Sequence, residues 1–130
     1  MKSQRMKNEK EKHEFDLEER TAIFAEDIIG FCKLLPPTVI NRPIISQLIR
    51  SGTSIAANYC EADCSETVKD FVHKMVICKK EAKETRFWLR AIAKAVPGIK
   101  SEARELWQEG NELIKIFSTI IRKTKSKIRI

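Results

Sequence analysis

Apolar residues recur every three or four positions along most of this chain, and this spacing limits the possible folds more than any other feature. The longest uninterrupted example covers residues 66–96, which contain no proline and no glycine. A period near 3.6 places such side chains on one face of an α-helix, whereas a half-buried strand requires polar and apolar residues to alternate. No segment alternates over the length of a strand. The sequence therefore predicts an all-α protein.

Four segments with helical spacing follow one another along the chain. The first covers residues 16–35 and ends at two prolines, because proline lacks the N–H that a helix needs. The second begins near Asn41, which is expected to be its N-cap. The third covers residues 66–96 after an N-cap at Ser65, and the fourth begins near Ser101 after a Pro-Gly turn. Four amphipathic helices with short connections predict an antiparallel up-down four-helix bundle.

The expected bundle occupies residues 14–124 as one domain, with a flexible, highly charged arm at 1–13 and a basic tail at 125–130. A run of small residues surrounds Gly52, so a neighbouring helix is expected to approach closely there. The core stripes are Leu17, Thr21, Phe24, Ile28, Phe31 and Leu35; Ile45, Leu48, Gly52, Ile55, Tyr59 and Ala62; Val68, Phe71, Met75, Cys78, Ala82, Thr85, Leu89, Ile92 and Val96; and Leu106, Leu113, Phe117 and Ile120.

Several classes of function are disfavoured by what the sequence lacks. No run approaches the roughly 18 apolar residues of a membrane span, and the N-terminus has no signal-peptide pattern, so a cytoplasmic protein is expected. Phosphate-loop, dinucleotide and nucleophile-elbow motifs are absent. A zinc site from Cys60, Cys64, Cys78 and His73 is conceivable, but free cysteines more often behave as small buried hydrophobes. No enzymatic activity, metal or cofactor is expected.

Charge gives the clearest indication of function. The chain carries 25 basic and 18 acidic side chains, and residues 98–130 alone carry eight basic against four acidic. Arg86, Arg90 and Lys94 step by four along one edge of the third helix. The C-terminal segment adds Arg122, Lys123, Lys125, Lys127 and Arg129. Such clusters favour phosphate backbones through counterion release, although a solvated helix face and tail would carry the same charge without a ligand.

Polar residues on the second and third helices and the aromatic residues carry further information. Asn58, Glu61, Glu81 and Glu84 are expected to form a buried polar network that fixes the register of the second and third helices, in preference to a ligand site. The aromatic residues mostly fall on apolar stripes, so single-strand reading by base stacking is not expected. Large apolar residues outside the stripes predict self-association. These are Ile49, Trp88, Trp107, Ile114 and Ile121.

Residues 51–92 resemble the bacterial four-helix-bundle family, also called the 23S ribosomal RNA intervening-sequence protein family. The matching elements are Ser51-Gly52-Thr53-Ser54-Ile55, Asn58-Tyr59, Glu61-Ala62, Asp70-Phe71, His73-Lys74, Lys80-Glu81-Ala82, Glu84-Thr85 and Trp88-Leu89, with Gln47 and Arg50 just upstream. The resemblance implies a small bundle that usually forms a pentamer around a central channel. The family is also similar to the accessory protein of diversity-generating retroelements, a basic pentamer that binds nucleic acid.

The sequence therefore favours two possible functions. The first is a non-enzymatic, homo-oligomeric bundle, a pentamer by resemblance, that binds RNA or DNA through its basic surface with little base specificity. The alternative is an oligomeric scaffold that binds a partner protein, in which the charge serves only solubility.

Overall fold

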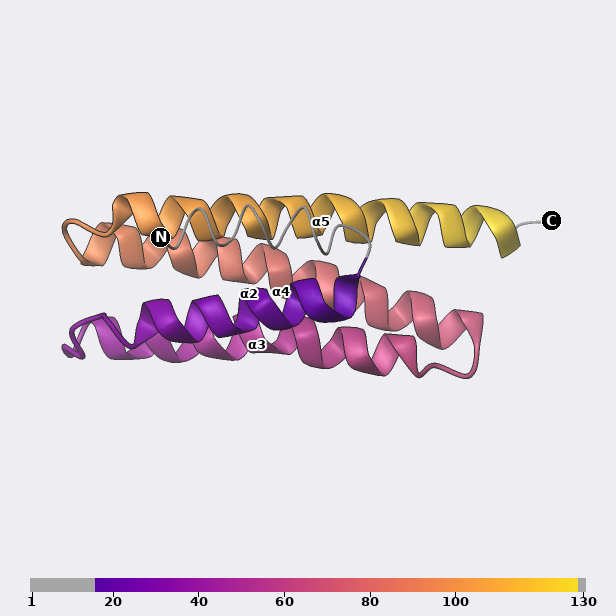
Figure 1. Cartoon of the computed structure of the whole chain (residues 1–130), viewed down its shortest axis with the longest axis horizontal. Coiled ribbons are helices and arrows are strands. Elements are labelled where there is room, and N and C mark those ends of the chain that lie inside the picture. The colour runs from indigo at the N-terminus through magenta and orange to yellow at the C-terminus, as the bar shows by residue number, and fades with distance from the viewer. Residues whose placement is uncertain (1–15, 129–130) are drawn as a thin grey trace.

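A computed structural model describes residues 16–128, which form four α-helices. They are α2 (Leu17–Cys32), α3 (Asn41–Asp63), α4 (Val68–Ala95) and α5 (Lys100–Ile128). Successive helices run antiparallel and lie side by side (Figure 1), and the described residues contain no strand. Both the all-α class and the up-down bundle predicted from the sequence are confirmed.

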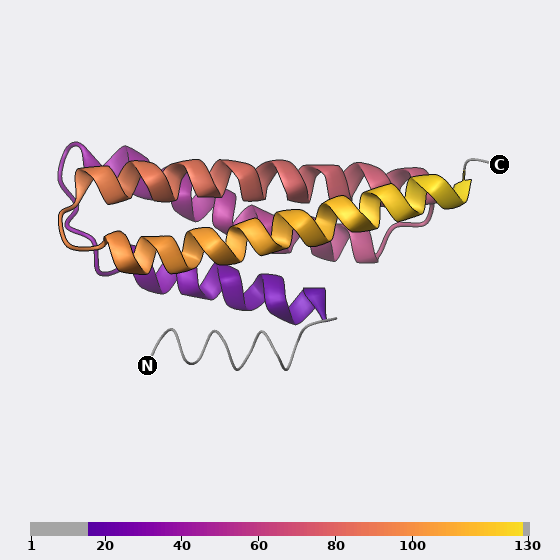
Figure 2. The ribbon, with the colours of Figure 1, turned by 90° about the horizontal axis from the view of Figure 1, so that it is seen from above.

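Helix α2 is much shorter than the helices that it accompanies. It has 16 residues, whereas α4 has 28 and α5 has 29. Figure 2 shows α2 running beside only one part of α5, on the side where the α4–α5 turn lies. The far part of α5 therefore packs on α4 without cover from α2.

The core contains most of the predicted stripes. Phe24, Ile28, Leu48 and Ile55 have almost no exposed surface. Four other members of the predicted stripes are only partly buried: Ile45, Tyr59, Phe71 and Ile120. Val68 is an exception, because it starts α4 with 47% of its surface exposed. Ile114 was predicted to lie outside the stripes but is 8% exposed and belongs to the core.

The predicted start of α3 needs correction. Asn41 is its first helical residue and not its N-cap. The Asn41 side-chain amide donates to the carbonyl of Pro36, while its backbone N–H donates to Thr38 Oγ1. Asn41 thus ties the α2–α3 loop to the helix. Helix α2 itself ends at Cys32, ahead of the two prolines, and Leu35 is buried from the loop.

The predicted cap of α4 is also wrong. Thr67 is the N-cap, and its hydroxyl accepts a hydrogen bond from the backbone N–H of Asp70 at 3.0 Å. The hydroxyl of Ser65 instead donates to the carbonyl of Glu61 in the last turn of α3. The chain between Ser65 and Thr67 is therefore a linker, and α4 begins two residues later than the sequence pattern indicated.

Helix α5 continues through Ile128, so residues 125–128 of the predicted basic tail are helical. The flexible arm predicted for residues 1–13 lies outside the described residues, and so does Arg129. The turn before α5 is tight because Gly98 has a φ of 88°, a left-handed conformation that glycine adopts without strain.

Three contacts hold the helices at close range. Gly52 on α3 faces Ile28 on α2, which confirms the close approach predicted at the small residues. Beside it, the buried hydroxyl of Thr85 donates to Ser51 Oγ at 2.9 Å and links α4 to α3. Arg20 on α2 forms two hydrogen bonds with the carboxylate of Glu109 on α5, at 2.8 and 2.9 Å, with 5% and 11% of the side chains exposed.

Candidate nucleic-acid interface

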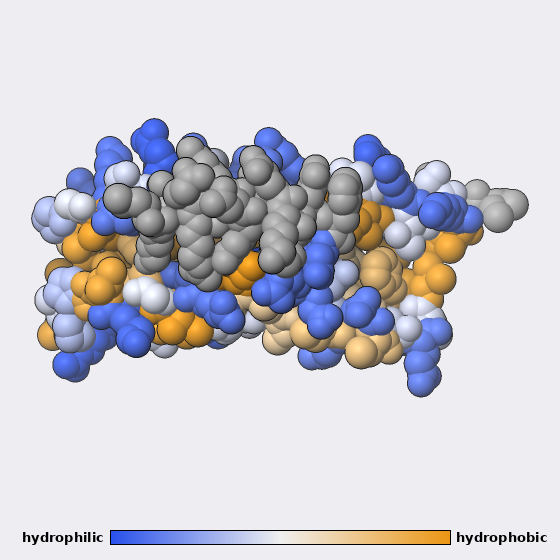
Figure 3. Space-filling view, viewed as in Figure 1, coloured by the Kyte–Doolittle hydropathy of each residue, from blue (hydrophilic) through white to orange (hydrophobic). Residues whose placement is uncertain are grey.

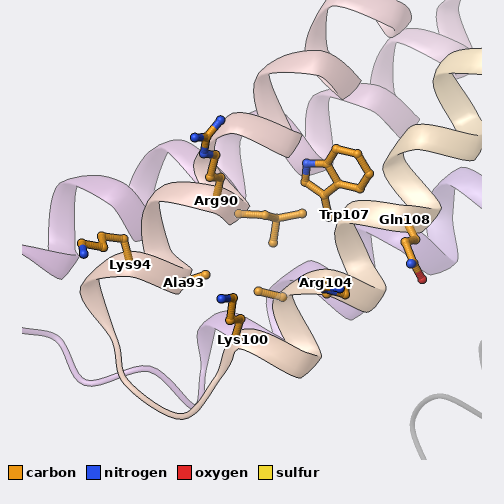
Figure 4. Close-up of a pocket in the computed structure, with 9 residues that line it drawn as sticks. Arg90, Ala93, Lys94, Lys100, Arg104, Trp107 and Gln108 are labelled. Atoms are coloured by element: carbon orange, nitrogen blue, oxygen red, sulfur yellow. The ribbon is translucent and has the colours of Figure 1, made fainter.

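A pocket of about 490 Å³ lies between the end of α4 and the start of α5. Four of the side chains that line it are cationic, two from each helix: Arg90 and Lys94 from α4, and Lys100 and Arg104 from α5. In Figure 4, Lys100 points into the space between the two helices, whereas Arg90 and Lys94 extend outward from α4, and the α4–α5 turn lies at one end. We call this site the basic pocket.

The helices place these cations with a regular geometry. Each pair is spaced by four residues, so both members lie on the same face of their helix. Lys94 near the end of α4 is favoured by the helix dipole, whereas Lys100 at the start of α5 is opposed by it. An anion near Lys100 would relieve this opposition.

The rest of the basic pocket is apolar or neutral. Leu89, Ala93, Ala103, Trp107 and Gln108 complete the lining, and no carboxylate contributes to it. The four cations therefore line the space without an acidic partner in the lining. A concave, largely apolar site with a few convergent charged groups is typical of ligand-binding sites.

Arg86 was predicted to continue the basic edge, but the structure places it elsewhere. Its guanidinium carbon lies 5.2 Å from the ring centroid of Trp107, and Nη1 donates to Asn111 Oδ1 at 2.7 Å. Arg86 is half-buried between α4 and α5 and does not line the basic pocket. Of the predicted trio, only Arg90 and Lys94 come together in one site.

The predicted C-terminal cations form a second, separate group. Arg122, Lys123, Lys125 and Lys127 are exposed on the last turns of α5, and we call them the C-terminal basic group. At 1.5 Å per residue, the middle of this group lies roughly 30 Å along the helix from Arg104. Figure 1 shows the end of α5 and the α4–α5 turn at opposite ends of the molecule. The basic surface thus has two parts.

The predicted polar network is divided into smaller contacts. Arg50 on α3 pairs with both Glu81 and Glu84 on α4, and Trp88 Nε1 donates to Glu84 at 2.9 Å. The hydrogen bond from Trp88 and the pairing with Arg50 lower the pKa of Glu84, while the Glu84 hydrogen bond raises the pKa of Arg50. Arg50, which in the sequence stands out only through the family resemblance, is the centre of this cluster.

The two other members of that set do not join the Arg50 cluster. Asn58 donates to the carbonyl of Ser54 within α3, and exposed Glu61 pairs with Lys74 on α4 at 2.6 Å. Only the Glu61–Lys74 pair links α3 to α4, at the surface, so the predicted set does not form one buried network.

The cysteines do not converge on a metal site. Cys78 is buried, its thiol donates to the carbonyl of Ile55, and burial raises its pKa to about 12. Cys60 and Cys64 are exposed. Across residues 16–128, no three His, Cys, Asp or Glu side chains are placed to hold a metal ion. No helix in this range is both long and apolar enough to cross a bilayer.

The fold and the basic pocket define a small cationic helical-bundle protein. The chain belongs to the family described as 23S rRNA-intervening sequence protein, whose model matches residues 13–119. It is also similar to a crystal structure of a protein of unknown function from the S23 ribosomal protein family of Bacteroides thetaiotaomicron. The two are 29% identical with a TM-score of 0.70, over 80% of this chain and 96% of that chain. No curated protein matches the chain.

Three residues of the basic pocket were missed from the sequence. In the sequence, Lys100 and Arg104 contribute only to the overall charge, and Trp107 is among the apolar residues expected to drive self-association. The spacing of Lys100 and Arg104 by four, directly after the Pro-Gly turn, is the signal that would have found them. A turn between antiparallel helices brings the end of one beside the start of the next.

Proposed function

We propose that this protein is a non-enzymatic, oligomeric bundle that binds the phosphate backbone of nucleic acid in the cytoplasm. The observation that carries the proposal is the basic pocket, where Arg90, Lys94, Lys100 and Arg104 line one concave site with no carboxylate. Clustered cations without acidic partners bind phosphates and release condensed counterions. The C-terminal basic group supplies a second set of exposed contacts.

Self-association is supported by apolar side chains left in contact with solvent. Leu34, Val39 and Ile40 in and beside the α2–α3 loop are 79%, 89% and 69% exposed, and Phe87 on α4 is 57% exposed. Figure 3 shows hydrophobic side chains at the end of the bundle that holds this loop. Clusters of exposed apolar residues mark interfaces, and closed cyclic rings are a common result. A pentamer is the number that the family resemblance implies.

The same loop is the observation that favours the alternative, a scaffold for a partner protein. Binding to nucleic acid and binding to a protein differ in their dependence on salt. The affinity for duplex DNA falls linearly on a log–log plot against salt, with a slope of about −0.9 for each phosphate contact.

The proposal is tested by titrating the oligomer with labelled duplex DNA at several salt concentrations. Lys100→Ala/Arg104→Ala is expected to make the slope less steep by about 1.8, since two contacts are lost. The matched control is Lys69→Ala/Lys80→Ala, which removes the same charge from exposed positions on α4 outside the basic pocket. Equal slopes for the two double variants would refute the pocket as the interface. Affinity no higher than that of an unrelated basic protein would favour the scaffold.

A further inference from the structure

The side chain of Trp107 gives the basic pocket a feature that phosphate binding alone does not use. It is 38% exposed and lies on the wall of the pocket, on the same helix as Lys100 and Arg104. Figure 4 shows the indole ring opposite Lys94 and Lys100, at the far end of the space from the α4–α5 turn. From the sequence, no exposed aromatic surface for base stacking is expected. The exposure of Trp107 corrects that expectation.

The ring is held in place before any ligand arrives. Arg86 stacks against it at 5.2 Å and is itself fixed by Asn111, so the indole has a defined orientation. Because Arg86 does not line the basic pocket, the ring still presents surface to it. A rigid aromatic surface loses little entropy when a base stacks on it.

The dimensions and lining fit one nucleotide. A volume of about 490 Å³ lies within the range of small-ligand sites, which is roughly 300–1,000 Å³. Leu89, Ala93 and Ala103 form an apolar floor beside the indole, and the four cations stand around it. Such a site offers a stacking surface to a base and positive charge to its phosphates.

The geometry points to the basic pocket as a site for an unpaired nucleotide, whose base stacks on Trp107 while Arg90, Lys94, Lys100 and Arg104 hold the flanking phosphates. This inference rests on the proposed function and adds a substrate class to it: single-stranded nucleic acid is bound in preference to a continuous duplex. Bases inside a duplex are stacked on one another and cannot reach a concave site, whereas unpaired bases stack readily on aromatic side chains.

The test compares two probes on the same protein. A labelled DNA single strand of about 20 nucleotides and the duplex of the same sequence are titrated by fluorescence anisotropy at low salt. Trp107→Ala is expected to weaken single-strand binding about tenfold or more, because each stacked base contributes that much, and to weaken duplex binding far less. Trp107→Phe keeps a stacking ring and should retain most of the affinity. Gln108→Ala is the matched control, since it lines the pocket without an aromatic ring.

A second measurement, the fluorescence of Trp107 itself, tests the stacking site even if the Trp107→Ala variant does not fold. In the Trp88→Phe protein Trp107 is the remaining tryptophan, and its fluorescence is expected to be quenched by the single strand and not by the duplex. The stacking site is refuted if Trp107→Ala weakens the binding of both probes equally, or of neither, and if quenching is absent. In that case the proposed function still stands as long as the wild-type protein binds the duplex. If the wild-type protein binds neither probe, the proposed function and this inference both fail.

Discussion

The close approach of α2 and α3 at Gly52 allows a sharp test of the bundle's packing. A Cβ at position 52 would lie 3.0 Å from Cγ2 and 3.1 Å from Cγ1 of Ile28. Ile28 is fully buried, and a β-branched side chain on a helix has one strongly preferred rotamer. It therefore cannot turn away, and Gly52→Ala must push the helices apart or strain Ile28.

The expected magnitude follows from two opposing effects. Overpacking a core costs about 1–3 kcal/mol, while alanine recovers about 1 kcal/mol of helix propensity relative to glycine. Gly52→Ala is thus expected to lower the free energy of unfolding by up to about 2 kcal/mol. Gly52→Leu should lower it further, because a larger side chain enters the same contact.

Gly110 on α5 provides the matched control. A Cβ there would lie 3.5 Å from Cγ of Arg86 and 3.7 Å from Cζ of Phe24, which are ordinary van der Waals distances. Gly110→Ala is therefore expected to stabilise the bundle by up to about 1 kcal/mol through helix propensity. The change in the free energy of unfolding is expected to have opposite signs at the two glycines. This difference separates the effect of packing from the effect of helix propensity.

Urea unfolding followed by circular dichroism measures both effects. In an Ile28→Ala background the two crowding carbons are gone, so Gly52→Ala should become neutral or stabilising. The coupling energy of this double-mutant cycle is expected between about 0.5 and 3 kcal/mol. Additive effects, or a Gly52→Ala protein that unfolds at the wild-type urea concentration or above, would refute this account of the α2–α3 contact.

Three further predictions follow from the contacts between and within the helices. Arg20→Met should lower the free energy of unfolding by about 1.5–3 kcal/mol, because it removes two charge-assisted hydrogen bonds to the carboxylate of Glu109, and a loss below about 1 kcal/mol in urea would contradict this. The pKa of Glu84 lies below its ordinary value of 4.5, so its contribution to stability is complete above that pH and is lost as pH falls through the folded pKa. Glu84→Gln should therefore flatten the fall in melting temperature below about pH 5, and parallel profiles would count against it. Cys60 and Cys64 should react with iodoacetamide near pH 8 in the native protein, whereas Cys78, whose pKa is about 12, should react only after unfolding, as mass spectrometry of the digested protein would show.

Helix number, order and inward faces could be read from the sequence because periodicity is a local property. Phe24, Ile28, Leu48 and Ile55 are buried as their spacing indicated. The caps could not be read in this way, since a cap depends on the path of the loop before it. Asn41 is drawn back to the carbonyl of Pro36 by the α2–α3 loop, and no local pattern encodes that contact.

Only part of the basic pocket could be predicted from the sequence, for a related reason. Arg90 and Lys94 were identified because both follow the four-residue step on one helix. Arg86 follows the same step, but Trp107 and Asn111 on another helix hold it. The basic pocket exists only after the turn brings α5 beside α4, so its second pair of cations depends on tertiary structure.

The ion pair between Arg20 and Glu109 joins positions 89 residues apart in the chain. Most packing in the bundle instead joins consecutive helices, α2 with α3, α3 with α4 and α4 with α5. Because the entropy cost of loop closure grows with loop length, we expect the consecutive hairpins to form first and α2 to dock on α5 last. An interaction absent from the folding transition state leaves the folding rate unchanged and slows unfolding. We therefore expect this ion pair to slow unfolding, and so to lengthen the lifetime of the native bundle, without accelerating folding.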